Sequence, residues 1–287
     1  VDLIKQLYGE PVWSLDSTTL AYEVINVPTE PEPGRYYTDW VQLYVLGSGQ
    51  AEQVIPRIGG MCATKLTFMQ PVLFLPDGQL AVVYHAYYSN EKDPYDIYSI
   101  NEEVYLMDLE TADISMIINA KDFEQVEAVQ SFSNFKWWDG KIVFELLGDF
   151  EEDGDVYAYL PADRKIEAVT SDPDLREQQP DSSKDLLCYV GVPRYGTISY
   201  QNPAGDIYIR QGSDLSKVSE NSKSSQPLFS PDGNFIAYVE YEYDQNYEYI
   251  KGRTIKSYNV GTGQTEEAVF SEQIIELAGW AVLEQEK

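Results

Sequence analysis

Cysteine and histidine are scarce in this chain of 287 residues, which holds two cysteines and one histidine. Two cysteines cannot form a disulfide scaffold, and the spacing of Cys62 and Cys188 matches no zinc motif. Cys188 lies in the apolar run LLCYVGV, where a reduced cysteine acts as a small core residue. The single histidine, His85, excludes a metal centre built from several histidines. These two residue types therefore predict neither a disulfide framework nor a zinc site.

Positive charge is also scarce, since 20 Lys and Arg stand against 48 Asp and Glu and give a formal net charge of −28. Such a surface repels nucleic acid and anionic lipid, because contacts with phosphates need clustered cations. The acidic residues are spread along the chain, so a solubilising surface explains most of them. The alternative interpretation is that the acidic surface attracts cations or a cationic partner. We expect no nucleic-acid partner.

Long apolar runs and helical periodicity are missing as well. No run approaches the roughly 18 apolar residues that a membrane span needs, and no basic segment leads into an apolar one as in a signal peptide. Only AKDFEQVEAV, residues 120–129, has the pattern of a short helix. Hydrophobic residues still make up 43% of the chain, which is enough for a substantial core. We therefore expect an all-β protein with no membrane insertion.

A repeated pattern stands in place of helices. It consists of a proline, an apolar residue, an aromatic residue, a turn with an aspartate, and an alternating apolar strand. The clearest copy is QPLFSPDGNFIAYV at 226–239, others begin at Pro11 and Pro71, and a degenerate one runs from Phe135 to Leu146. Asp-Gly between short apolar strands is a strong hairpin signal, because Gly adopts the positive φ of a tight turn. Each copy predicts two strands, a and b, with its turn fixed by one aspartate: Asp16, Asp77, Asp139 or Asp232.

A second hairpin, with strands c and d, follows each copy, as in VYLMDLETADISMII at 104–118 and IKSYNVGTGQTEEAVF at 255–270. The unit is thus four short antiparallel strands. Repeated four-stranded units are typical of β-propeller blades. The units are predicted at 10–58, 70–120, 131–170, 185–220 and 226–272.

The segment QPLFSPDGNFIAYV, with the later YNVGTGQTEEAVF, resembles the repeat of TolB-type β-propellers. The blades of that family read Pro-x-Trp-Ser-Pro-Asp-Gly-x-x-Ile-Ala-Phe and end in an Asp/Asn-x-x-Thr-Gly hairpin. The resemblance is specific at 226–270, good at 10–58 and 70–118, weak at 131–170, and carried by strand rhythm at 185–220. It implies a propeller that serves as an interaction platform, and it carries no universal catalytic residues.

The two chain ends supply a sixth unit beside these five. Residues 274–285 predict one or two inner strands and residues 2–9 an outer strand. Pairing of the termini 1–9 and 274–287 would close the ring without exposed sheet edges. We therefore expect one domain, residues 1–287, folded as a six-bladed propeller with a composite closing blade; five blades are the alternative.

Connections differ in length between the two ends of the predicted blades. The a–b and c–d turns are short, whereas the b–c connections, for example 87–103 and 241–253, are long. They lie at the other end together with the d–a crossovers, one of which is predicted at 171–184. Function tends to lie on the long loops of a rigid scaffold, and tyrosine suits binding surfaces. The alternative is that these tyrosines only pack across extended b–c hairpins. The predicted partner-binding residues are Tyr36, Tyr37, Trp40, Tyr87, Tyr88, Tyr95, Tyr98, Tyr241, Tyr243, Tyr247 and Tyr249.

One b–c connection, DFEEDGD, places Asp149, Glu151, Asp153 and Asp155 at the spacing of the first half of a calcium loop. Leu160 stands where the closing acid of such a loop is expected, so the motif is half formed. An exposed acidic hairpin is the main interpretation and a calcium site the alternative. We expect no other cofactor.

Catalytic motifs are missing too. No G-x-S-x-G elbow occurs, so we expect no hydrolase domain like the one that follows some related propellers in peptidases. His85 is better explained as a packed or edge-exposed strand residue than as a catalytic base. We therefore predict a monomeric propeller without enzymatic activity, secreted, periplasmic or on the cell surface, that binds a protein or peptide. The alternatives are a carbohydrate-binding or glycan-active propeller with channel carboxylates, and the sensor domain of a larger membrane-anchored protein.

Overall fold

The computed structural model is almost entirely β-structure, with one short 3-10 helix in the part of the chain that it describes. It divides into two compact units, Val1–Phe132 and Ser133–Lys287, which are described separately below. The single domain predicted from the sequence stays a prediction. The described residues are 3–28, 38–45, 51–53, 60–62, 65–90, 93–111, 113–123, 131–147, 154–194, 204–244, 250–273 and 277.

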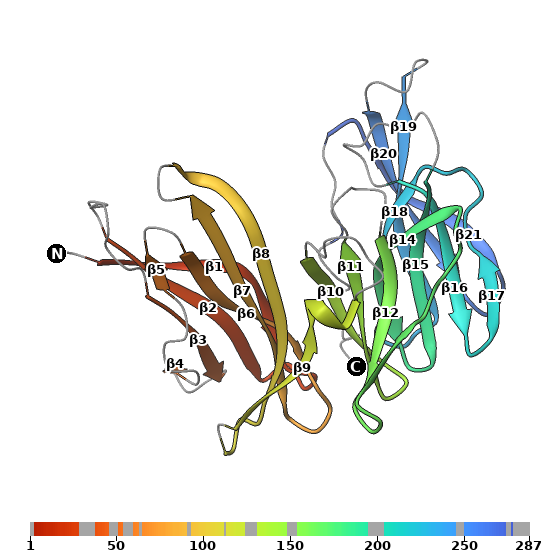
Figure 1. Cartoon of the computed structure of the whole chain (residues 1–287). Helices are drawn as coiled ribbons and strands as arrows, with labels where there is room; N and C mark the ends of the chain where they lie inside the picture. The colour runs from red at the N-terminus through yellow and green to blue at the C-terminus, as the bar shows by residue number, and fades with distance from the viewer. Residues whose placement is uncertain are drawn as a thin grey trace, which may run out of the picture. The chain divides into compact units, whose positions relative to one another are not determined.

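The first unit holds two antiparallel sheets whose strands follow one another in chain order (Figure 1). The first sheet has the order β1-β2-β3-β4 and the second the order β5-β6-β7-β8-β9. The strands are β1 (Leu3–Trp13), β2 (Thr19–Pro28), β3 (Thr38–Val45), β4 (Ala51–Gln53), β5 (Gly60–Cys62), β6 (Lys65–Phe74), β7 (Leu80–Asn90), β8 (Asp93–Met107) and β9 (Ile114–Asn119), followed by the helix η1 (Ala120–Phe123).

Three four-stranded antiparallel sheets follow, again in chain order: β10 to β13, β14 to β17, and β18 to β21. Their strands are β10 (Ser131–Trp138), β11 (Lys141–Leu147), β12 (Gly154–Leu160), β13 (Lys165–Ala168), β14 (Leu175–Ser183), β15 (Leu186–Pro193), β16 (Asp206–Gln211), β17 (Asp214–Lys217), β18 (Ser224–Phe229), β19 (Phe235–Tyr243), β20 (Ile250–Asn259) and β21 (Gln264–Ser271).

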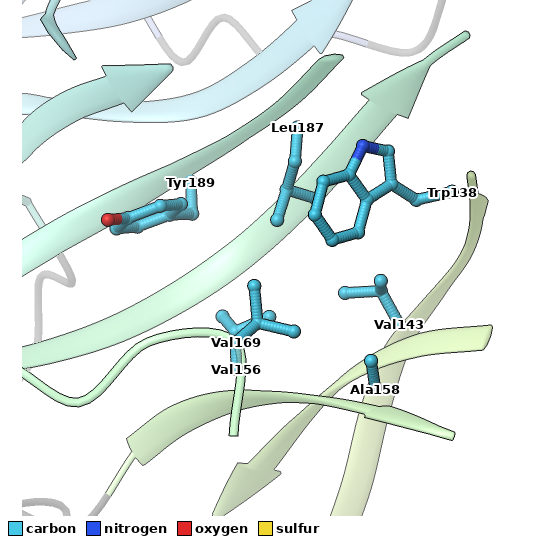
Figure 2. Close-up of a cluster of buried hydrophobic side chains, with 7 residues drawn as sticks. All are labelled: Trp138, Val143, Val156, Ala158, Val169, Leu187 and Tyr189. Carbon is cyan, nitrogen blue, oxygen red and sulfur yellow. The ribbon is translucent and has the colours of Figure 1, made fainter. Parts of the chain in front are cut away.

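The core of the second unit forms where one sheet faces the next. Figure 2 shows one such cluster, in which Trp138, Val143 and Val156 of the β10–β13 sheet meet Leu187 and Tyr189 of the β14–β17 sheet. Full burial of one such aliphatic side chain contributes about 1.5–3 kcal/mol. Packing of sheet on sheet is thus the main source of stability in this unit.

A bulge in the first strand of a sheet ties it to its neighbour. The pairing register shifts between Gln178 and Asp181 in β14, and Gln179 there has a φ of 53°. The main-chain N–H of Gln179 donates to Glu145 Oε2 of β11 at 3.0 Å. The side-chain Oε1 of Gln179 in turn accepts the N–H of Gln226, which sits at the corresponding bulge of β18 with a φ of 54°. Polar side chains therefore satisfy the main-chain groups that the bulges free.

The sequence prediction of consecutive four-stranded antiparallel units is confirmed, except that the second sheet has an additional short strand, β5. The number of blades stays a prediction. Three local predictions were wrong. Residues 3–8 are not an outer strand but pair with β2, from Leu3 opposite Pro28 to Tyr8 opposite Glu23. The crossover predicted at 171–184 contains the strand β14, and most of the connection predicted at 87–103 belongs to the long strands β7 and β8.

The short helix predicted at 120–129 is described only as far as Phe123, where it is a single 3-10 turn.

Candidate functional site

A cluster of ionisable side chains lies where β12 begins and β15 ends. Asp155 is the second residue of β12, Glu177 lies on β14, and Arg194 follows the last residue of β15. β12 begins after one b–c connection and β15 ends before the next, so the cluster lies at the end of these sheets that carries the b–c connections, called here the b–c end. The main-chain N–H of Arg194 donates to the carbonyl of Asp174 at 3.0 Å, which holds Arg194 in place.

An ion pair joins two of these side chains, since the Arg194 Nη2 donates to Asp155 Oδ1 at 2.8 Å. Glu177 is 1% exposed, and its Oε1 accepts the main-chain N–H of Asp172 at 3.3 Å. Asp155 and Arg194 both influence the pKa of Glu177. The cluster therefore holds two interacting carboxyl groups beside one guanidinium.

Burial raises the pKa of Glu177 from its ordinary value of 4.5 to about 8, and the hydrogen bond and the negative charge of Asp155 act in the same direction. The guanidinium of Arg194 opposes this shift only in part. Glu177 is consequently a neutral carboxylic acid at pH 7. It can donate a hydrogen bond or release a proton near neutral pH, as groups at binding and catalytic sites do.

Aromatic rings adjoin this cluster. The rings of Tyr189 and Tyr208 stack with centroids 5.6 Å apart and an interplanar angle of 12°. Burial, and then the negative charge of Glu177, raise the pKa of Tyr189. Burial and the charge of Asp155 likewise raise the pKa of Tyr157. The rings reduce access of water, which strengthens the electrostatic interactions within the cluster.

A second buried carboxyl belongs to Glu145 of β11. Its Oε2 accepts hydrogen bonds from the Asn134 amide at 2.6 Å and from the main-chain N–H of Gln179 at 3.0 Å. Burial is the largest influence on its pKa and raises it. These two partners lie on β10 and β14, the first strands of two successive sheets. Glu145 therefore holds β10 and β14 together, and β14 is the strand that carries Glu177.

The predicted partner-binding tyrosines are only partly described. Tyr241 is 9% exposed, it accepts a hydrogen bond from Ser225 Oγ at 2.8 Å, and its ring packs against that of Tyr243 at 6.2 Å. Tyr241 is therefore a packed residue. The backbone, but not the side chain, is described for Trp40 on β3, Tyr87 and Tyr88 on β7, and Tyr95 and Tyr98 on β8. Tyr36, Tyr37, Tyr247 and Tyr249 lie outside the described residues, so the binding role of these tyrosines stays a prediction.

The calcium site also stays a prediction, because Asp149, Glu151 and Asp153 lie outside the described residues. Asp155, the remaining candidate ligand, is paired with Arg194, whose charge competes with that of a cation. Within the described part of the chain, no group of three or more His, Cys, Asp or Glu side chains is arranged to hold a metal ion.

His85 is packed, as the sequence predicts. It is buried on β7, and its Nδ1 lies 2.7 Å from Glu102 Oε1 on the neighbouring strand β8. The other oxygen of Glu102 accepts the main-chain N–H of Phe132 at 2.7 Å. This pair connects three chain segments and explains why a lone histidine is buried here.

Sequence reasoning missed Glu177 because it assigned residues 171–184 to a crossover. A signal for the strand was nevertheless present. The pattern Gln/Glu-Pro-x-x-Ser-x-Asp runs from Glu10 to Asp16 and from Gln226 to Asp232, and it recurs as QPDSSKD from Gln179 to Asp185. That fourth-unit copy has Asp181 and Ser182 where the clearer copies have an apolar and an aromatic residue after the proline.

Successive four-stranded antiparallel meanders define the chain as a β-propeller, and comparison with solved structures agrees. Puromycin hydrolase is matched with a TM-score of 0.59 and 11% identity over 94% of this chain and 39% of that chain. An oligogalacturonate lyase from Vibrio parahaemolyticus is matched with a TM-score of 0.53 and 11% identity over 93% of this chain and 78% of that chain. At such identities the likeness concerns the fold alone.

TolB from Acinetobacter baumannii is also among the matched structures, with a TM-score of 0.49, 15% identity and coverage of 93% of this chain and 56% of that chain. The chain thus spans little more than half the length of that TolB and about two fifths of puromycin hydrolase. No protein-family model and no curated protein sequence matches the chain. Among the described residues, no helix has the length and hydrophobicity of a membrane span.

The comparisons correct one prediction. The sequence analysis inferred a protein without enzymatic activity from the lack of catalytic motifs, but enzymes occur among the solved structures that share this fold. The lack of a serine-hydrolase motif in this sequence does not separate binding propellers from enzymes. The location outside the cytoplasm and the monomeric state stay predictions.

Proposed function

We propose that this propeller binds a protein or peptide partner at the b–c end of its sheets. The observation that carries the proposal is the Asp155–Glu177–Arg194 cluster, which is buried or half-buried at that end. By contrast, Asp232 in the a–b turn of the fifth sheet serves the turn itself, because it accepts the N–H of Asn234 at 3.0 Å.

The cluster supports a binding role because the fold does not need it. Burial of charged groups destabilises a protein unless they are fully paired, and an apolar set of similar volume packs a sheet equally well. Buried carboxyls with a shifted pKa are enriched at functional sites for this reason. Tyrosines of the b–c connections would add aromatic contacts around the cluster.

The charge of the chain supports a cationic partner. The formal net charge is −28, and the acidic residues Asp149, Glu151 and Asp153 immediately precede Asp155 in the sequence. A lysine- or arginine-bearing segment would be attracted to such a surface over a distance of about one Debye length, roughly 8–10 Å. The proposed ligand is therefore a basic segment of a protein.

Peptides selected from a displayed random library against the intact chain test this proposal. We expect the selected peptides to be rich in Lys and Arg, and we expect Asp155→Asn to weaken their binding in calorimetry by roughly tenfold, as for one charge of a partly buried pair. Asp163→Asn is the matched control, because Asp163 is an exposed aspartate in the turn between β12 and β13.

Circular dichroism confirms that each variant is folded before its affinity is compared. A selection that yields no binder, binders without cationic residues, or equal losses in the two variants would each overturn the proposal.

A further inference from the structure

The first unit contains a pocket of about 380 Å³ that belongs to neither the candidate site nor the b–c end. The buried residues Phe74 and Leu75 form its floor, and Leu15, Pro76 and Leu109 line it further out. These residues belong to the a–b turns of the first and second sheets and to the turn between β8 and β9. The pocket is therefore a mainly apolar hollow between three turns of neighbouring sheets.

Main-chain hydrogen bonds hold all three turns. Ser14 N–H donates to the Thr19 carbonyl at 2.8 Å, Leu75 N–H donates to the Gln79 carbonyl at 2.8 Å, and Asp108 N–H donates to the Asp113 carbonyl at 2.9 Å. The pocket is consequently preformed, and a ligand loses little affinity to ordering the chain.

The edge of the pocket carries one acidic residue, Asp16, and its lining includes no Lys or Arg. Hydrogen bonds from Ser14 and Thr18 lower the pKa of Asp16 to about 2. All of these bonds go to its Oδ1, so Oδ2 accepts none from the described residues. An apolar surface beside a carboxylate oxygen that can still accept a hydrogen bond suits an aliphatic side chain that ends in a cation.

The second unit shows a cation in the corresponding place. The turn pattern Ser-x-Asp places Leu15 of the first sheet in the same position as Lys184 of the fourth. Lys184 Nζ donates to the main-chain carbonyl of Asp232, in the a–b turn of the next sheet, at 2.7 Å. In the first sheet the corresponding residue is a leucine that is 64% exposed, so the chain supplies no such lysine there.

We propose that the pocket between the a–b turns of the first two sheets binds a lysine or arginine side chain of a partner peptide, flanked by an apolar residue. The aliphatic part of the side chain would lie on Phe74 and Leu75, and its cation would meet the carboxylate of Asp16 at the edge of the pocket. This site is independent of the candidate site at the b–c end.

Titration of the intact, nitrogen-15-labelled chain with the blocked tripeptide Leu-Lys-Leu tests the proposal, with Leu-norleucine-Leu as the uncharged probe of equal length. We expect the amide signals of Ser14, Thr19, Leu75 and Gly78 to shift on addition of Leu-Lys-Leu. We expect the norleucine probe to bind about fivefold more weakly, the size of effect of one exposed ion pair. Shifts confined to other residues, or equal binding of the two probes, would refute the site.

Two variants separate this pocket from general attraction to an acidic surface. Leu15→Lys restores the residue type found at position 184, and we expect it to weaken binding of Leu-Lys-Leu about fivefold or more, because the new lysine occupies the pocket. The matched control, Leu215→Lys, adds the same charge at an exposed leucine on β17 and should leave the affinity unchanged. Equal losses in both variants would overturn the proposal.

A third variant, Asp16→Asn, removes the charge at the edge of the pocket and keeps an oxygen that accepts the turn hydrogen bonds. We expect it to reduce the preference for Leu-Lys-Leu over the norleucine probe. An unchanged preference would exclude Asp16 as the group that recognises the cation.

Discussion

Strand β14 has a hydrophilic sequence, yet several of its polar side chains are buried. Glu177, Gln178 and Asp181 are all buried, and each position is explained by the neighbours it contacts. Asp181 Oδ2, for example, accepts the main-chain N–H of Phe229 at 2.7 Å, and its Oδ1 lies 3.0 Å from Lys136 Nζ. Main-chain groups at the bulges take the place of water for these side chains.

We expect the stability of the protein to depend on pH through Glu177. An unfolded glutamate loses its proton near the ordinary pKa of 4.5, whereas folded Glu177 keeps it to about pH 8. Between these values the folded state binds more protons, so the free energy of unfolding falls as the pH rises. Glu177→Gln removes this contribution, and urea unfolding should show it to be more stable than the wild type by about 1–3 kcal/mol at about pH 8 and not at about pH 5.

Glu266→Gln, at an exposed position on β21, serves as the control for this experiment and should follow the wild type at both pH values. Parallel pH curves for the wild type and Glu177→Gln would contradict the assignment of Glu177 as a buried acid.

Cys188 provides a second prediction for a single residue. It is fully buried, and burial raises the pKa of its thiol well above the ordinary value of 9.0. The thiolate, which is the reactive form, is therefore scarce in the folded protein. We expect iodoacetamide to label Cys188 only in urea, with peptide mass spectrometry as the measurement. Labelling of the native chain at the rate seen in urea would show that Cys188 is accessible.

At the level of strands, the Asp-Gly pairs between short apolar strands predicted hairpin turns correctly. Gly78, Gly140 and Gly233 do adopt positive φ values, of 87°, 79° and 73°. The copy QPDSSKD was missed because Leu186 follows its aspartate where Asp-Gly turns have glycine, and the positive φ of this turn, 57°, falls on Lys184. A non-glycine residue in this conformation gives no local signal in a single sequence.

Candidate-site prediction was limited in the same way. Glu177 and Arg194 are far from Asp155 in the sequence, and only the packing of the β10–β13 sheet against the β14–β17 sheet brings them together.

Alternating tyrosines did not distinguish a binding loop from a packed hairpin, since exposed loops and extended hairpins share the pattern. For Tyr241, which is on β19, the hairpin interpretation holds.

Two glycines near strand ends offer a test of the packing between neighbouring chain segments. A Cβ added at Gly205, which pairs with Ser224, would lie 2.1 Å from the main-chain oxygen of Gly191. Because backbone cannot move aside cheaply, we expect Gly205→Ala to destabilise the protein by about 2–4 kcal/mol in urea unfolding. At Gly261 the nearest atom is Asn259 Oδ1 at 3.5 Å, so Gly261→Ala should change stability by less than about 0.5 kcal/mol. Equal effects would mean that the segment around Gly205 packs more loosely.

For the molecule as a whole, charge imbalance outweighs ion pairing. Even if each of the 20 Lys and Arg paired with one acid, 28 of the 48 acidic residues would keep an unbalanced negative charge. Half-buried pairs such as Lys256–Glu240, at 2.7 Å, stabilise locally, while the excess of like charges destabilises the compact state.

Salt should therefore stabilise the folded chain. Raising sodium chloride from about 0.01 M to about 0.15 M shortens the Debye length from roughly 30 Å to roughly 8 Å, which screens repulsion between distant acids more than attraction within close pairs. We expect the midpoint of thermal unfolding to rise, and to rise equally in tetramethylammonium chloride, because the effect is one of ionic strength. A fall in the midpoint would mean that the ion pairs dominate. A rise with sodium chloride alone would indicate specific binding of sodium ions. Either result would contradict the inference that screening of repulsion between acidic residues stabilises the folded chain.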